Sequence, residues 1–322
     1  MPPLYTKPLK VFKKAYAFMN PDSSNFGRNW KMFSVKDFAN ELIYTALMED
    51  KPTMIARIGS NELRCLTNYL GVRHPERYKN PRSFIKSQTP AYWWEDSMLH
   101  QMQTGAGFFP ARIDMIERFC ELMIKDMPAV DILGSWLKEE SFFKGQLEGS
   151  KKVMLEDLEP FFSIKPWTAA LKDKKVLVIH PFAETIESQY KKREKLFDTS
   201  LLPAFELKTI KAIQSIAGEK TPFNDWFEAL EHMKDAISAT DFDICILGCG
   251  AYGFPLAAHV KSMGKKAVHL GGVAQLLFGI KGSRWETYLV YPYANMYNEY
   301  WVRPSDKEKP ANASKVEGAC YW

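Results

Sequence analysis

The stretch "FDICILGCGAYGFPLAAHVKSMGKKAVHLGG", Phe242–Gly272, decides the fold. An apolar run leads into Gly248, Gly250 and Gly253, a segment with helical character follows, and a second apolar run closes the stretch. Apolar runs without strict alternation are typical of parallel strands that are buried on both faces. The stretch therefore predicts a strand, a tight loop, a helix and a parallel strand.

The same pattern recurs on the N-terminal side. Apolar runs predict further strands at 53–58, 130–133, 174–182 and 205–210, beside those at 242–247 and 266–270. Segments between them have a helical period, among them 60–70, 89–104 and 110–127. This alternation predicts an α/β protein with a doubly wound, mostly parallel, Rossmann-like sheet and helices on both faces. We expect residues 1–50 to form an N-terminal helical, basic segment, 51–300 the Rossmann-like domain, and 301–322 an extended arm packed on it.

Composition narrows the class of protein. The chain has 322 residues, of which 46% are hydrophobic, enough for a sizeable core. No apolar run approaches the roughly 20 residues that span a bilayer, and the N-terminus lacks the apolar centre of a signal peptide. Five scattered cysteines predict neither a disulfide framework nor a zinc site, which favours a reducing, cytoplasmic compartment. The net charge of +5 suits an anionic ligand, but no dense basic stripe indicates nucleic-acid binding.

Lysines and apolar residues alternate near the N-terminus. The lysines are Lys7, Lys10, Lys13 and Lys14, and the apolar residues are Leu9, Val11, Phe12, Tyr16 and Phe18. We favour a short surface helix with one face on the core. The alternative is an interfacial helix that rests on anionic lipid at the inner face of a membrane.

Three predicted strand ends carry polar or glycine-rich loops: "RIGSNE" (57–62), "HPFAET" (180–185) and "GCGAYG" (248–253). Ligands of doubly wound sheets bind beyond the carboxyl ends of the strands. His180 could therefore bind phosphate or act as a general base toward an acceptor hydroxyl, or it could simply form hydrogen bonds in its loop.

The glycine loop admits three interpretations. Its spacing fits a dinucleotide fingerprint, but the carboxylate that binds the ribose of NAD should follow the next strand, where Gly271 and Gly272 stand instead. We favour a loop for phosphate or a nucleotide-sugar, ahead of a simple turn and of an NAD site. The candidate binding residues are Gly248, Gly250, Ala251, Tyr252, Gly253 and Gly272.

The stretch "RIGSNE" resembles the Arg-x-Gly-x-x-Glu signature of glycosyltransferases with the GT-D fold, which act in bacterial polysaccharide and glycoprotein assembly. The stretch 242–272 is similar to the glycine-rich nucleotide loop of that family. The resemblance implies a glycosyltransferase that uses a nucleotide-diphosphate sugar and a glycan or lipid-linked acceptor. It implies donor binding by Arg57, Gly59 and Ser60, and catalysis by Glu62.

Ser60 departs from the family, which has Asp at this position. A hydroxyl is a weaker ligand than a carboxylate for Mg²⁺ or Mn²⁺. Either Glu62 and the phosphates hold the metal, or cations replace it at the departing diphosphate. Arg57, Lys281 and Arg284 are candidates for that role, although the last two could equally lie in a surface turn.

The sequence thus predicts a nucleotide-sugar-dependent glycosyltransferase with Glu62 or His180 as the base. Two alternatives remain: an NAD-dependent oxidoreductase, and a noncatalytic protein that binds sugar nucleotides.

Overall fold

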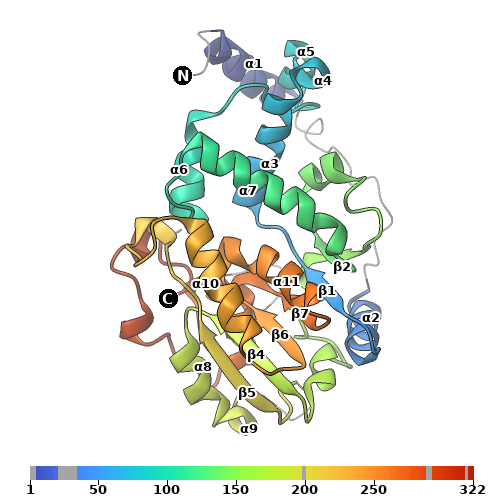
Figure 1. Cartoon of the computed structure of the whole chain (residues 1–322), viewed down its shortest axis with the longest axis vertical. Coiled ribbons are helices and arrows are strands. Elements are labelled where there is room, and N and C mark those ends of the chain that lie inside the picture. The colour runs from blue at the N-terminus through green and yellow to red at the C-terminus, as the bar shows by residue number, and fades with distance from the viewer. Residues whose placement is uncertain (1–4, 21–34, 198–200, 288–291, 316–317) are drawn as a thin grey trace.

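The computed structural model describes residues 5–20, 35–197, 201–287, 292–315 and 318–322. Within these residues, seven parallel strands form one sheet in the order β3-β2-β1-β7-β6-β4-β5 (Figure 1). The strands are β1 (Thr53–Ala56), β2 (Ile132–Ser135), β3 (Lys151–Met154), β4 (Lys175–His180), β5 (Glu206–Lys211), β6 (Ile244–Leu247) and β7 (Lys266–His269). The predicted α/β fold with a parallel sheet is confirmed.

Helices cover both faces of the sheet (Figure 1). The α-helices are α1 (Thr6–Met19), α2 (Lys36–Met48), α3 (Ser60–Arg73), α4 (Pro75–Tyr78), α5 (Pro81–Ile85), α6 (Asp96–Gly105), α7 (Ile113–Asp126), α8 (Ala183–Tyr190), α9 (Arg193–Leu196), α10 (Trp226–Ser238), α11 (Gly253–Ser262) and α12 (Ser283–Glu286). Short 3₁₀ helices join them, including η4 (Leu155–Leu158), η5 (Trp167–Leu171), η7 (Gly250–Tyr252) and η8 (Gly271–Phe278). No helix of the described residues is long and apolar enough to cross a membrane.

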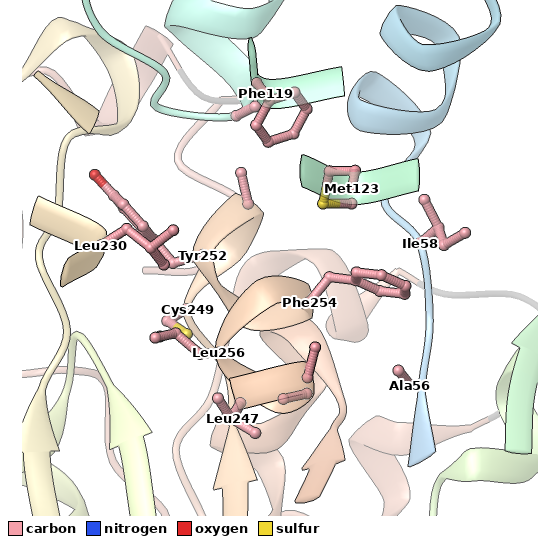
Figure 2. Close-up of a cluster of buried hydrophobic side chains, with 14 of the residues drawn as sticks. Ala56, Ile58, Phe119, Met123, Leu230, Leu247, Cys249, Tyr252, Phe254 and Leu256 are labelled. Atoms are coloured by element: carbon pink, nitrogen blue, oxygen red, sulfur yellow. The ribbon is translucent and has the colours of Figure 1, made fainter. Parts of the chain in front are cut away.

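One face of the sheet packs against α3, α7, α10 and α11. Figure 2 shows this core: Ala56 of β1 and Leu247 of β6 lie below Phe254 and Leu256 of α11, and Phe119 of α7 closes the layer above. These side chains are buried. The opposite face packs against α2, α8, η5 and η8. Because both faces are covered, β1, β2 and β6 are buried at every position, which explains their continuous apolar runs.

Gly253 lets the first turn of α11 lie directly against β7. A Cβ atom at this position would overlap the buried ring of His269. We therefore expect Gly253→Ala to lower the free energy of unfolding by about 1–3 kcal/mol, the usual cost of overpacking a core. Urea unfolding measures this loss. Gly149→Ala is the control, because the space around Gly149 is open, and an equal loss in both variants would contradict the packing role of Gly253.

Candidate functional site

A cavity of about 520 Å³ lies at the carboxyl edge of the sheet. All seven described strands lead into its wall, through Arg57 after β1, Trp136 after β2, Leu155 after β3, His180 at the end of β4, Ile213 after β5, Gly248 after β6 and Leu270 after β7. Parallel α/β sheets bind their ligands at this edge. The cavity is therefore the candidate functional site.

The centre of the cavity lies at a topological switch point. β4 and β6 are neighbours, but the chain continues from β4 to β5 on one side and from β6 to β7 on the other. Right-handed crossovers then place α8 and α11 on opposite faces of the sheet, which leaves a crevice between the two strand ends. His180 and Gly248 occupy these ends, and a Cβ atom at Gly248 would overlap the His180 ring.

The three glycines of the loop after β6 have different roles. Gly248 and Gly253 allow close packing against His180 and His269. Gly250 instead adopts a left-handed backbone with φ of +57°, lines the cavity, and has open space where a side chain would stand. No side chain caps the N-terminus of α11. The loop thus brings a helix N-terminus to the cavity, an arrangement that favours a bound anion.

His180 presents an N–H group to this part of the cavity. Its Nδ1 accepts a hydrogen bond from the backbone N–H of Phe182 at 3.0 Å, so the proton of the neutral ring resides on Nε2. Burial lowers the pKa of His180 to about 3. His180 is 2% exposed, and the hydrogen bond from Phe182 to Nδ1 is the one that its ring makes within the described residues. This geometry favours His180 as a neutral hydrogen-bond donor over His180 as a general base.

Arg57 supplies positive charge from the end of β1. Its guanidinium lies 5.2 Å from the ring centroid of Trp136, and a Cβ atom at Gly271 would lie 3.0 Å from Nη1. Within the described residues, the buried Nε atom has no hydrogen-bond partner. Burial lowers the pKa of Arg57, whereas the charge of Glu62 raises it. Arg57 therefore has unused hydrogen-bonding capacity beside the loop after β7.

Gly59 explains the spacing of the Arg-x-Gly-x-x-Glu motif. It precedes α3, and the carboxylate of Glu62, in the first turn of that helix, folds back over its Cα. A Cβ atom at Gly59 would overlap the carboxylate oxygens. Burial raises the pKa of Glu62, while its own backbone N–H and the charge of Arg57 oppose that rise. The motif therefore places a carboxylate at the cavity wall within the field of an arginine.

The C-terminal arm forms another wall. Nη1 of Arg284 donates a hydrogen bond to the Tyr321 hydroxyl at 3.1 Å, and the guanidinium lies 4.8 Å from the centroid of that ring. The charge of Arg284 lowers the pKa of Arg57, so the two cations share one electrostatic environment. Tyr321 and Trp322 both line the cavity, and the ring of Tyr321 covers Gly272.

Ten of the sequence-predicted residues line the cavity: Arg57, Gly59, Ser60, Glu62, His180, Gly248, Gly250, Tyr252, Gly272 and Arg284. Three others do not. Ala251 and Gly253 are buried in the packing of α11. The ammonium of Lys281 lies 5.5 Å from the ring centroid of Tyr297, outside the cavity wall.

Sequence reasoning missed Glu159 and Tyr293, which line the cavity beyond β3. The Tyr293 hydroxyl donates a hydrogen bond to the Glu159 carboxylate. Burial raises the pKa of Glu159 to about 7, although that hydrogen bond and the charge of Lys36 lower it. These residues are 134 positions apart, and neither belongs to a local motif that could have identified it.

The described residues contain no group of three or more His, Cys, Asp or Glu side chains that could hold a metal ion. Glu62 provides one carboxylate beside Arg57, and Ser60 provides a hydroxyl. Mg²⁺ and Mn²⁺ prefer several oxygen ligands, carboxylates among them. This donor set does not match a metal site that the protein alone would hold.

The fold and the cavity define the chain as a parallel α/β protein with cationic and aromatic groups at the carboxyl edge of its sheet. No family model, curated protein or solved structure matches the chain.

The buried histidines predict a dependence of stability on pH. Burial lowers the pKa of His269 to about 3 from the usual 6.5. In the unfolded chain, the imidazole takes up a proton below its usual pKa, whereas in the folded chain it stays neutral. Stability should therefore fall as the pH falls from about 6 toward 4, by about 1.4 kcal/mol per pH unit for this histidine.

The variant His269→Gln isolates this effect. We expect the free energy of unfolding, measured by urea titration at several pH values, to fall less steeply toward acid in the variant than in the wild type. Parallel pH profiles for the two proteins would show that His269 titrates normally in the folded state.

Proposed function

We propose that the chain is a glycosyltransferase that binds a nucleotide-diphosphate sugar in this cavity and transfers the sugar to an acceptor hydroxyl. The observation that carries the proposal is the position of Gly250. It lines the cavity at the switch point of the sheet, in the loop that leads from Gly248, which packs against His180, to the N-terminus of α11. Backbone and side-chain donors converge there, as a diphosphate requires.

The charges around this point support a dianionic ligand. Arg57 reaches the loop after β7 at Gly271, and Arg284 lies close enough to influence its pKa. Two cations that repel each other in a partly buried site are stabilised by an anion between them. In the proposed reaction they would stabilise the nucleoside diphosphate as it departs.

Aromatic side chains line the same cavity and supply surfaces for a base and a sugar. They are Trp136, Phe182, Tyr252, Trp285, Tyr293, Tyr321 and Trp322. Their polar edges can form hydrogen bonds while their faces stack. This lining suits a nucleotide-sugar better than inorganic phosphate alone.

Glu62 is the proposed base. The acceptor oxygen would attack the anomeric carbon of the sugar, and the bond from that carbon to the diphosphate oxygen would break. The proton of the hydroxyl would pass to the Glu62 carboxylate. Burial raises the pKa of this carboxyl, which makes it a better proton acceptor than an exposed glutamate. His180 is better suited to binding the nucleotide-sugar, because its Nε2 atom carries a proton and can donate a hydrogen bond.

The resemblance to GT-D glycosyltransferases adds support at the level of individual residues. Arg57, Gly59 and Glu62 share one wall of the cavity, and the glycine-rich loop lies on the same cavity. An NAD site has less support, because the loop after β7 contributes Leu270, Gly271, Gly272 and Val273 and no carboxylate for a ribose.

Turnover distinguishes a transferase from a protein that only binds sugar nucleotides. The purified chain is incubated with UDP- and GDP-sugars and a preparation of lipid-linked saccharides, and release of nucleoside diphosphate is measured. We expect release from one donor class that increases with the acceptor. Binding without release would favour a noncatalytic protein, and hydride transfer to NAD would favour the oxidoreductase.

A further inference from the structure

The helix α1 presents an apolar face to solvent. Its inner face consists of residues spaced three or four apart, beginning with buried Thr6 and continuing through Leu9 and Lys13. Leu9 packs against a small cluster that contains Phe84 of α5 and Trp93. The ammonium of Lys13 lies 4.4 Å from the ring centroid of Phe84. These contacts hold α1 on α5 and fix which side of the helix faces outward.

The outer side of α1 carries large apolar residues that the fold leaves uncovered. Phe18 is 89% exposed, Met19 71%, Val11 65%, Phe12 59% and Tyr5 49%. At 100° per residue they occupy one continuous sector of the helix. Exposed large apolar residues in such a continuous patch mark an interaction surface.

Basic residues border one edge of this apolar sector and continue over the lobe that carries α1. On α1, Lys7 and Lys14 are exposed at one edge of it. The segments 5–20 and 73–87, which form α1, α4 and α5, contain nine Lys and Arg against the single acidic residue Glu76. Their net charge is thus +8, while the whole chain has +5, so the remaining residues carry a net charge of −3. Among those remaining residues, Glu95 lies against α1 and pairs with Lys10 at 3.7 Å. The positive charge of the protein is concentrated in this lobe, at one end of the molecule (Figure 1).

We propose that α1 docks the protein on an anionic lipid bilayer. The apolar sector would enter the boundary between headgroups and acyl chains, and the lysines along its edge would contact anionic headgroups. Charge complementarity favours the lipid surface over a second copy of the chain, because a second copy would bring the same basic lobe against itself. None of the residues in this sector lines the cavity, so the proposal is independent of the proposed function.

Co-flotation of the full chain with vesicles tests the proposal. Vesicles of phosphatidylcholine alone are compared with vesicles that contain equal amounts of phosphatidylcholine and phosphatidylglycerol. We expect binding to the second kind, reduced by added salt because the electrostatic part is screened. The double variant Lys7→Gln, Lys14→Gln should lower the partition coefficient about 30-fold.

A second double variant tests whether the apolar sector of α1 enters the bilayer. Phe12→Ser with Phe18→Ser should reduce partitioning at least about tenfold, because each removes apolar surface from the bilayer boundary. The matched control is Phe38→Ser with Ile164→Ser, which are 47% and 86% exposed outside α1. Lys172→Gln with Lys220→Gln controls for charge. Both controls should bind like the wild type, and circular dichroism should show that all variants are folded.

Three results would overturn the proposal. The wild type could fail to float with anionic vesicles, the Phe12 and Phe18 variant could bind as well as the control, or α1 could mediate self-association. Light scattering after gel filtration detects the last case, in which the wild type would be a dimer and the Phe12 and Phe18 variant a monomer.

Discussion

Glu62→Gln is expected to reduce sugar transfer by about 10²-fold or more at saturating donor and acceptor, the usual contribution of a positioned acid–base group. The amide keeps the shape of the side chain over Gly59 but cannot accept the acceptor proton. Donor affinity should change little, since the arginines and the glycine loop contact the diphosphate in the proposed complex. Steady-state release of nucleoside diphosphate measures the effect.

Two further variants separate catalysis from stability. Glu228 stands in the first turn of α10, so Glu228→Gln removes an equivalent charge from a helix N-terminus. It should cost at most about 1 kcal/mol of stability and no activity. Gly59→Ala should displace the Glu62 carboxylate, because the new methyl would overlap it, and should lower turnover as well. Near-normal transfer by Glu62→Gln would remove this residue from the mechanism.

Gly250→Val is expected to weaken nucleoside diphosphate binding by about 100-fold or more, because its side chain would fill the space proposed for the phosphates. A valine is also strained at φ of +57°. Gly264→Val is the matched control, since Gly264 has φ of +82° and open surroundings but lies outside the cavity wall. Both variants should lose stability in thermal melts, whereas only Gly250→Val should lose binding in calorimetry. If Gly250→Val bound the nucleoside diphosphate as tightly as Gly264→Val, the loop after β6 would have only a structural role, as a tight turn.

The sheet could be predicted from the sequence because most strands are continuous apolar runs. β3 escaped prediction because its sequence is KKVM. Lys152 is buried there, and its ammonium donates hydrogen bonds to the carbonyls of Leu147 and Ser150. A lysine whose charge is satisfied by backbone carbonyls leaves no hydrophobic signal in the sequence.

Two helix starts were predicted too early. The predicted helix at 89–104 begins only at Asp96. The carbonyls of Ala91 and Trp93 accept hydrogen bonds from the side chain of Asn68, which also accepts one from the backbone N–H of Glu95. This tertiary contact holds the backbone before α6 outside the helix. The predicted helix at 110–127 likewise begins at Ile113 rather than at Pro110.

Some residues of the candidate site could likewise be predicted from the sequence, and others could not. Arg57, Gly59 and Glu62 were singled out through their resemblance to the Arg-x-Gly-x-x-Glu signature, a short motif that spans one strand end and the first turn of one helix. Glu159 and Tyr293 meet only through the tertiary fold, so no local spacing marks them. Lys281 and Arg284 are close in sequence, yet only Arg284 lines the cavity.

The central claim is that the cavity at the carboxyl edge binds a nucleoside diphosphate. Calorimetric titration of the wild-type chain with UDP, GDP, CMP and NAD, each with and without Mn²⁺, tests it most directly. We predict that one nucleoside diphosphate binds with a stoichiometry of one, more tightly than CMP and NAD. Failure of both UDP and GDP to bind under either condition, or tighter binding of NAD, would contradict the account.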